Sequence, residues 1–130
     1  MKKALFLFAG AIMMVFAVSC GKSTTYEVYN GTSDIPLYNI KVYEYSGSSM
    51  IKMKDVGTLY SNSSSGSIEA TRGADQVQLT FKLEAFGGDI YTTADFYSLR
   101  NGEHTLIRLD DYTQVYGGSK DALTVEKAAK

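Results

Sequence analysis

The strict alternation of apolar and polar residues over residues 77–85 limits the fold of this chain more than any other feature. In the stretch VQLTFKLEA every second residue is apolar, beginning with Val77 and ending with Ala85. A period of two places the apolar side chains on one face of a β-strand and the polar side chains on the other. Apolar residues at helical spacing are hard to find before the C-terminal residues. The sequence therefore predicts an all-β domain.

Shorter stretches of the same kind predict further strands in the first half of the chain, over residues 26–29, 37–45, 50–54 and 67–70. The polar stretch SNSSSGS, residues 61–67, predicts a flexible loop. About seven strands separated by turns in roughly 100 residues are typical of a sandwich of immunoglobulin-like size. The chain has no tryptophan, so the Cys–Trp–Cys signature of immunoglobulin domains is absent. We predict an antiparallel β-sandwich over residues 26–116 and a flexible tail over residues 117–130, with at most one helical turn.

Two turns predict how the strands of the second half pair. Asn101 and Gly102 form the strongest short signal for a tight hairpin, because both residues tolerate positive φ. Gly87 and Gly88 can form a second tight hairpin upstream. Together the two turns predict a C-terminal three-stranded antiparallel meander, with strands over residues 76–86, 90–99 and 104–110.

The register that these turns impose assigns residues to the core. The later turn would set Asp95 opposite Arg108, a pair of opposite charges that stabilises neighbouring strands. The earlier turn would set Phe81 opposite Ala94. Both registers place the even-numbered residues of the middle strand, including Phe96, in the core and turn the odd-numbered residues outward.

The N-terminal segment differs from the rest of the chain. Lys2 and Lys3 precede an uncharged, mostly apolar run that ends at Ser19. This run is about as long as a signal-peptide core and shorter than the roughly 20 residues that span a bilayer. Two small residues, Ala17 and Ser19, stand close before Cys20, the single cysteine of the chain.

The pattern before Cys20 resembles the lipobox of bacterial lipoproteins, with Ala17 where a leucine is commonest. The resemblance implies a lipoprotein signal peptide over residues 1–19, a diacylglycerol on the Cys20 thiol, and a lipidated linker over residues 20–25. Two alternatives are an uncleaved membrane anchor and an ordinary signal peptide for which Cys20 is incidental. Lipidation is favoured because a lone cysteine cannot form an internal disulfide, and a free thiol is a liability in an oxidising compartment.

The residues after the cysteine and the overall charge indicate a location and a class of partner. The stretch GKSTT has no aspartate next to Cys20 and no acidic cluster. By resemblance to known sorting signals, this implies the periplasmic face of the outer membrane. Without Lys2 and Lys3 the formal net charge changes from −1 to −3. No basic patch is present in the sequence, so nucleic acid is not an expected partner.

The sequence shows no recognisable catalytic or metal-binding pattern. His104, the single histidine, is predicted to be a solvated turn residue rather than the base of a serine hydrolase. Asp110 and Asp111 form the single acidic doublet, which is predicted to end a strand and is too small for a calcium loop. The glycines lack the spacing of a phosphate-binding loop. We predict no catalytic residue, no metal and no cofactor. An enzyme with an unrecognised site is kept as an alternative.

Ten tyrosines stand out in the composition. Most are expected simply because tyrosine favours strands. The predicted register nevertheless turns Tyr91, Tyr97 and Leu106 to the outer face of the meander, where they form a candidate interaction face.

The favoured hypothesis is a lipid-anchored, non-enzymatic module that binds other envelope proteins. In size and layout the body resembles small envelope lipoproteins with a β-sandwich domain, including subunits of secretion systems. The alternative is a lipoprotein that binds a small ligand or a glycan with a tyrosine-rich face.

Overall fold

The computed structural model describes residues 22–118 and 121–130. The predicted signal peptide and Cys20 lie outside these residues. Within the part of the chain that the structure describes, no helix is long and apolar enough to span a membrane.

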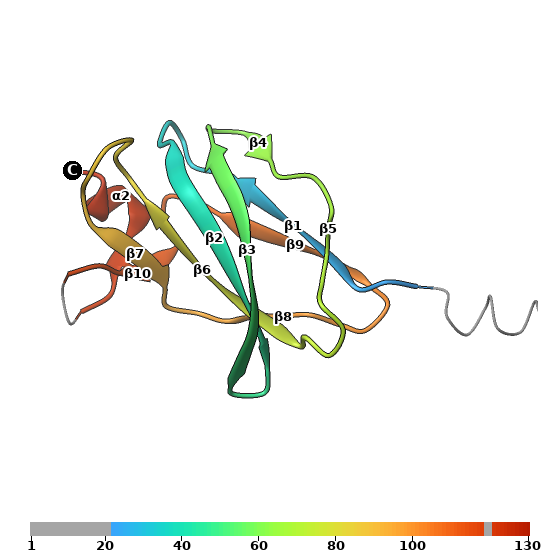
Figure 1. Ribbon diagram of the computed structural model, residues 1–130. Coiled ribbons are helices and arrows are strands. Elements are labelled where there is room, and N and C mark those ends of the chain that lie inside the picture. Colours follow the sequence, from blue (N-terminus) through green and yellow to red (C-terminus); the bar gives the residue numbers. More distant parts are fainter. Residues whose placement is uncertain (1–21, 119–120) are drawn as a thin grey trace, which may run out of the picture.

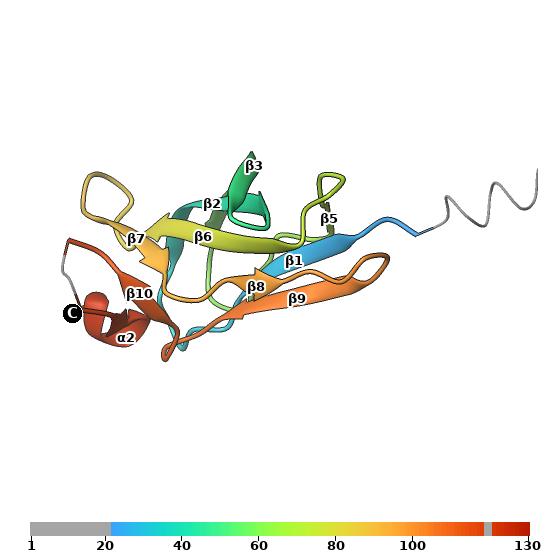
Figure 2. The ribbon, with the colours of Figure 1, turned by 90° about the horizontal axis from the view of Figure 1, so that it is seen from below.

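The fold is a sandwich of two β-sheets, which confirms the predicted all-β class (Figures 1 and 2). The large sheet has seven strands. Six follow the order β11 (Leu123–Thr124), β10 (Gln114–Tyr116), β7 (Ile90–Thr93), β6 (Gln76–Lys82), β2 (Leu37–Ser46) and β3 (Ser49–Leu59), and β8 (Tyr97–Ser98) pairs with β6 as well. The small sheet is built around β1 (Thr25–Asn30), which pairs with β4 (Ser63–Ser64), β5 (Ile68–Glu69) and β9 (His104–Leu109).

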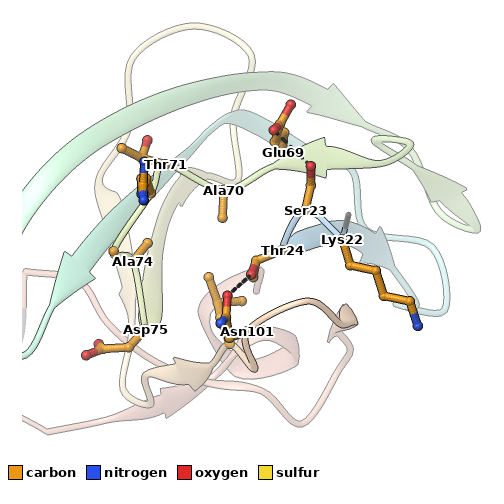
Figure 3. A pocket seen from close by; sticks show the side chains of 12 residues that line it. Lys22, Ser23, Thr24, Glu69, Ala70, Thr71, Ala74, Asp75 and Asn101 are labelled. Carbon is orange, nitrogen blue, oxygen red and sulfur yellow. Dashed lines mark hydrogen bonds between the residues drawn. The ribbon is translucent and has the colours of Figure 1, made fainter. Parts of the chain in front are cut away.

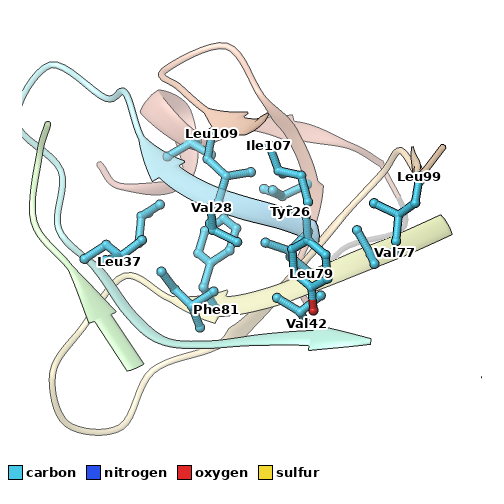
Figure 4. Close-up of a cluster of buried hydrophobic side chains, with 14 residues drawn as sticks. Tyr26, Val28, Leu37, Val42, Val77, Leu79, Phe81, Leu99, Ile107 and Leu109 are labelled. Carbon is cyan, nitrogen blue, oxygen red and sulfur yellow. The ribbon is translucent and has the colours of Figure 1, made fainter. Parts of the chain in front are cut away.

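One hydrophobic core fills the space between the two sheets. In β1 and in β6 every second residue is buried, so the inward face of each strand meets the other sheet. Figure 4 shows these side chains converging from both sheets. The predicted alternation of residues 77–85 is confirmed for Val77, Leu79 and Phe81, which are buried. Beyond the end of β6 the pattern fades, since Leu83 is half-buried and Ala85 is exposed.

The predicted C-terminal meander is wrong, because β9 belongs to the other sheet. It pairs in parallel with β1 along its whole length, from His104 opposite Thr25 to Leu109 opposite Asn30. The Asn101–Gly102 turn does form, and Gly102 has the expected positive φ of 76°. The turn fixes only the local backbone, however, and here it carries the chain from one sheet to the other.

Burial explains why β9 joins the small sheet. There Ile107 and Leu109 become fully buried against the large sheet, whereas β8, the predicted partner of this strand, has only two residues. The predicted pairing of Asp95 with Arg108 is absent from the ion pairs of the described residues. Instead, the Arg108 guanidinium lies 5.3 Å from the centre of the Tyr29 ring.

The predicted core face of residues 90–99 is also wrong. The hairpin from β6 to β7 has a wide loop over residues 83–89 rather than a two-residue turn, so that Phe81 lies opposite Tyr91 and not Ala94. This is a shift by an odd number of residues, and such a shift turns every side chain to the other face of the sheet. Accordingly Thr93 is buried, whereas Phe96 is 42% exposed.

The predicted flexible tail is wrong for residues 121–130, which pack onto the large sheet. β11 pairs with β10, and the single helical turn α2 (Val125–Ala128) follows it directly. Val125 is fully buried in the core. The Thr124 hydroxyl accepts a hydrogen bond from the main-chain N–H of Lys127 and so caps the turn. The C-terminal residues therefore contribute to the folded domain.

Candidate functional site

The three residues of the predicted interaction face do not lie on one surface. Tyr97 is half-buried against the core, and this burial raises its pKa, with a further contribution from the nearby charges of Asp95 and Asp110. Tyr91 also packs against the core, where its ring stacks on Phe81 at a centroid distance of 6.5 Å. Leu106 is 54% exposed, as predicted, but it lies on β9 of the small sheet. The predicted interaction face depended on the register of the meander, and because the meander does not form, the face does not form either.

A hollow lies where the described chain begins, and we call it the proximal hollow (Figure 3). Its volume is about 760 Å³. Its walls come from three segments that are far apart in the sequence: residues 22–24, residues 69–75, and Leu99 with Asn101.

Hydrogen bonds fix the first residues of the domain to these walls. Thr24 accepts the main-chain N–H of Ala70 at its carbonyl oxygen (2.9 Å) and the N–H of Gly102 at its hydroxyl (2.9 Å). The same hydroxyl donates to Asn101 Oδ1 at 3.3 Å, the contact drawn across the hollow in Figure 3. Ser23 Oγ donates to Glu69 Oε1 at 3.1 Å. Residues 23–25 therefore belong to the folded domain rather than to the predicted linker over residues 20–25.

Beneath the Thr71 side of the hollow lies a buried carboxylate, Glu44, at an inward position of β2. Tyr26 donates to Glu44 Oε2 at 2.7 Å, and the main-chain N–H of Thr71 donates to Oε1 at 3.0 Å. Lys54 Nζ lies 3.1 Å from Oε2 and also donates to the carbonyl oxygen of Glu69. We call these residues the Glu44 network.

The protonation states in the Glu44 network follow from its contacts. Burial opposes ionisation of Glu44, but the hydrogen bonds from Thr71, Tyr26 and Lys54 together outweigh it, so the pKa of this carboxyl lies below its usual value. Burial, together with the neighbouring carboxylate, raises the pKa of Tyr26. The phenol thus stays a donor and the carboxylate stays charged at neutral pH. Because Tyr26 belongs to the small sheet and Glu44 to the large sheet, the network links the two sheets.

His104 is exposed, as predicted, but it belongs to a strand and not to the turn. It begins β9, where the parallel pairing places it beside β1. Its Nδ1 lies 2.8 Å from Thr25 Oγ1, and its Nε2 lies 2.9 Å from Glu27 Oε1. Glu27 Oε2 accepts a hydrogen bond from Ser64 at 2.6 Å. The hydrogen bonds from Ser64 and from His104 lower the pKa of Glu27.

A hydroxyl, an imidazole and a carboxylate in this order can activate a nucleophile when a substrate cleft surrounds them. Here the three groups lie on the exposed face of the small sheet, and none of them lines the proximal hollow. The arrangement joins three neighbouring strands, β9, β1 and β4, through their side chains. Among the described residues, no group of three or more His, Cys, Asp or Glu side chains could hold a metal ion.

The β6–β7 loop lies at the end of the sandwich opposite the proximal hollow (Figures 1 and 2), and exposed apolar side chains lie in it and in the strands next to it. Phe86, at the tip of this loop, is 93% exposed. Ile90 and Tyr116 are also exposed, and Tyr116 lies opposite Thr92, two residues along the strand from Ile90. Side chains so related lie diagonally next to each other on one face of a sheet. We call Phe86, Ile90 and Tyr116 the distal patch.

The sequence reasoning missed the distal patch because it extended the strand through residue 86. The signal that could have found it is an aromatic residue beside Gly87 and Gly88. Both glycines adopt positive φ, 70° and 79°, and consecutive residues in this conformation end a strand and open a loop. An aromatic side chain next to such a loop has no strand face on which to pack.

Comparisons with known proteins give the fold and nothing more specific. No protein-family model matches the chain, and no curated protein matches it. Among solved structures, the chain is similar to one described as the NMR structure of the protein from Eubacterium rectale. The two share 22% sequence identity and superpose with a TM-score of 0.53, over 78% of this chain and 93% of that one. At this level of identity the likeness shows a shared fold alone.

Proposed function

We propose that the chain is a lipid-anchored, non-enzymatic interaction module of the bacterial envelope. A diacylglycerol on Cys20 holds one end at the periplasmic face of the outer membrane, and the opposite end binds another envelope protein. A subunit of an envelope-spanning assembly, such as a secretion system, would have this layout. The observation that carries the proposal is the distal patch, whose most exposed side chain, Phe86, is 93% exposed.

The place of the distal patch supports a role in binding. The described chain begins at Lys22, beside the proximal hollow, and the β6–β7 loop lies at the other end of the sandwich (Figure 1). A lipid at Cys20 would therefore leave the loop facing away from the membrane. Exposed apolar side chains that gather on one surface of a domain mark sites of protein–protein interaction. Aromatic residues, phenylalanine included, are enriched in the cores of protein interfaces.

The other two hypotheses have less support. A tyrosine-rich binding face is weakened because Tyr91 and Tyr97 pack against the core. An enzyme would need a cleft at its reactive groups, and the Thr25–His104–Glu27 arrangement lies on an open sheet surface.

The anchor is tested by replacing Cys20 with alanine in cells that are fed a fatty-acid analogue. We expect the native chain to carry the label and to sediment with membranes, and Cys20→Ala to lose both properties, because the thiol is the proposed attachment point. Label that persists on the variant would contradict the lipid anchor. Lys3→Arg, which keeps the cysteine, the small residues before it and the charge of the N-terminal segment, is the control for general effects on export.

The interaction is tested by placing a photo-crosslinking amino acid at position 86 in the lipidated protein. We expect one envelope protein to be captured there and not at position 60, because Tyr60 is an exposed aromatic residue outside the distal patch. Once that protein is identified and purified, Phe86→Ala should weaken its binding by about 2 kcal/mol or more, as at interface hot spots. Tyr60→Ala should bind it normally. Equal affinities for Phe86→Ala and the native chain would reject the distal patch as the interface.

A further inference from the structure

We infer that the end of the domain around the proximal hollow rests directly on the bilayer, where Lys22, Arg72 and Arg100 bind the phosphates of anionic phospholipids. This inference rests on the proposed lipid anchor and adds a second contact to it. The lipid places Cys20 at the membrane surface, and the cations would hold the domain in one orientation on that surface.

The tether between the lipidated cysteine and the folded domain is short. Ser23 and Thr24 are bound to Glu69, Ala70 and Gly102 by hydrogen bonds. Only Gly21 and Lys22 therefore separate the lipidated cysteine from the fixed part of the domain. The three residue-to-residue steps from Cys20 to Ser23 span at most about 11 Å when fully extended. Ser23, in the lining of the proximal hollow, would therefore lie within that distance of the lipidated cysteine.

Three cations lie at the end of the domain around the proximal hollow. Lys22 and Arg72 line the hollow, and Arg100 precedes Asn101 in its wall. None of the ion pairs among residues 22–118 and 121–130 involves these three cations. The Lys22 side chain extends away from the other labelled residues of the lining (Figure 3). All three are exposed and can reach a phosphate.

The acidic residues of the same end are mostly engaged within the protein. Glu69 accepts a hydrogen bond from Ser23, and the Asp75 carboxylate accepts the main-chain N–H of Gly47. Glu103, next to the Asn101–Gly102 turn, is exposed. The donors to Glu69 and Asp75 are neutral and leave the carboxylates charged, so the three acidic residues balance the three cations in formal charge. Lys22, Arg72 and Arg100 nevertheless take part in none of the ion pairs of the described residues and are exposed.

The opposite end of the sandwich differs from this end in its charge. There the described acidic residues outnumber the basic ones: Glu84, Asp89, Asp110, Asp111, Asp121 and Glu126 against Lys82, Lys127 and Lys130. An anionic surface repels the acidic end more strongly than the end around the proximal hollow, where the formal charges balance, and so favours the orientation in which the hollow faces the membrane. Each basic residue near an anionic bilayer contributes about 1 kcal/mol of binding free energy at moderate salt. Three cations therefore bind weakly alone and become effective once a lipid holds the domain at the surface.

The test uses residues 20–130 with Cys20→Ala, so that no lipid contributes; this chain contains the whole core. Its binding is measured by co-sedimentation with vesicles of phosphatidylcholine and with equimolar mixtures of phosphatidylcholine and phosphatidylglycerol. We expect binding to the anionic vesicles alone, and weaker binding as salt is added. Arg72→Gln and Lys22→Gln should each lower the partition coefficient about fivefold. Arg108→Gln, on the outer face of the small sheet, is the matched control and should have a smaller effect.

Three results would overturn the inference: equal binding to both kinds of vesicle, equal losses for Arg72→Gln and Arg108→Gln, or displacement by inorganic phosphate beyond the effect of chloride at the same ionic strength. The last result would indicate a site for a free anion instead of a membrane surface. The denaturation midpoint of each variant shows that it is folded. Because this protein carries no lipid, the result does not depend on the fatty-acid labelling. Failure of the anchor and failure of the cationic contact can therefore be told apart.

Discussion

Replacing Glu44 with alanine is expected to lower the free energy of unfolding by about 3–5 kcal/mol. The carboxylate is fully buried and accepts hydrogen bonds from Tyr26 and Thr71 while it pairs with Lys54. Without it, a buried phenol and a main-chain N–H lose their acceptor, and the Lys54 ammonium keeps only the carbonyl oxygen of Glu69. The loss is measured as the shift of the denaturation midpoint in urea, with the slope of the transition unchanged. Glu84→Ala, in the exposed β6–β7 loop, is the control and should change the stability by no more than about 0.5 kcal/mol.

The dependence of stability on acidic pH is a second test of the Glu44 network. A carboxyl whose pKa is lower in the folded than in the unfolded chain stabilises the fold above its unfolded pKa, about 4.3. That stability is lost as the pH falls through the folded pKa. The pKa of Glu44 is lowered, so the native protein should lose stability progressively below about pH 4.3. In Glu44→Gln this part of the pH dependence should be missing. An identical acid profile in both proteins would mean that the carboxylate is solvated.

Phe81→Ala is the second substitution with a large expected effect, about 3–5 kcal/mol. The Phe81 ring is fully enclosed between the sheets and stacks against Tyr91. Its removal leaves a cavity that the surrounding strands cannot fill completely. The loss is measured in the same urea titration.

Phe86→Ala is the matched control for this substitution, because it removes the same side chain from the exposed tip of the next loop. It should leave the stability within about 0.5 kcal/mol of the native value. Similar losses for the two variants would contradict the fold around β6.

Sequence reasoning succeeded where the information was local. The alternation around Leu79 fixed both the existence and the inward face of β6. The Asn101–Gly102 dipeptide likewise predicted a turn, and the turn is present. Which strand β9 joins was not local information, because Ile107 and Leu109 alternate equally well in either sheet. The choice depends on β1, whose Tyr26 and Val28 would otherwise lack a neighbour on that side.

The candidate sites escaped prediction for the same reason. The proximal hollow is made by three segments that meet only in the folded chain. The contacts of His104 with Thr25 and Glu27 follow from the parallel pairing of β9 with β1 and carry no sequence signature. Glu44 has the alternation of a core residue but the chemistry of a surface residue, and only its three partners explain its burial.

The parallel pairing of the first strand with β9 has a consequence for the order of folding. During synthesis the N-terminal residues are made first, so Thr25 of β1 is present long before His104 of β9, with which it pairs. Until then β1 has a free edge, and the inner face of the large sheet is covered on one side only. Bringing β9 to β1 closes a long loop, and this closure costs conformational entropy before the contacts between the two strands form. High contact order of this kind is typical of folding in the millisecond-to-second range, so the small sheet is completed only after the residues of β9 are available to pair with β1.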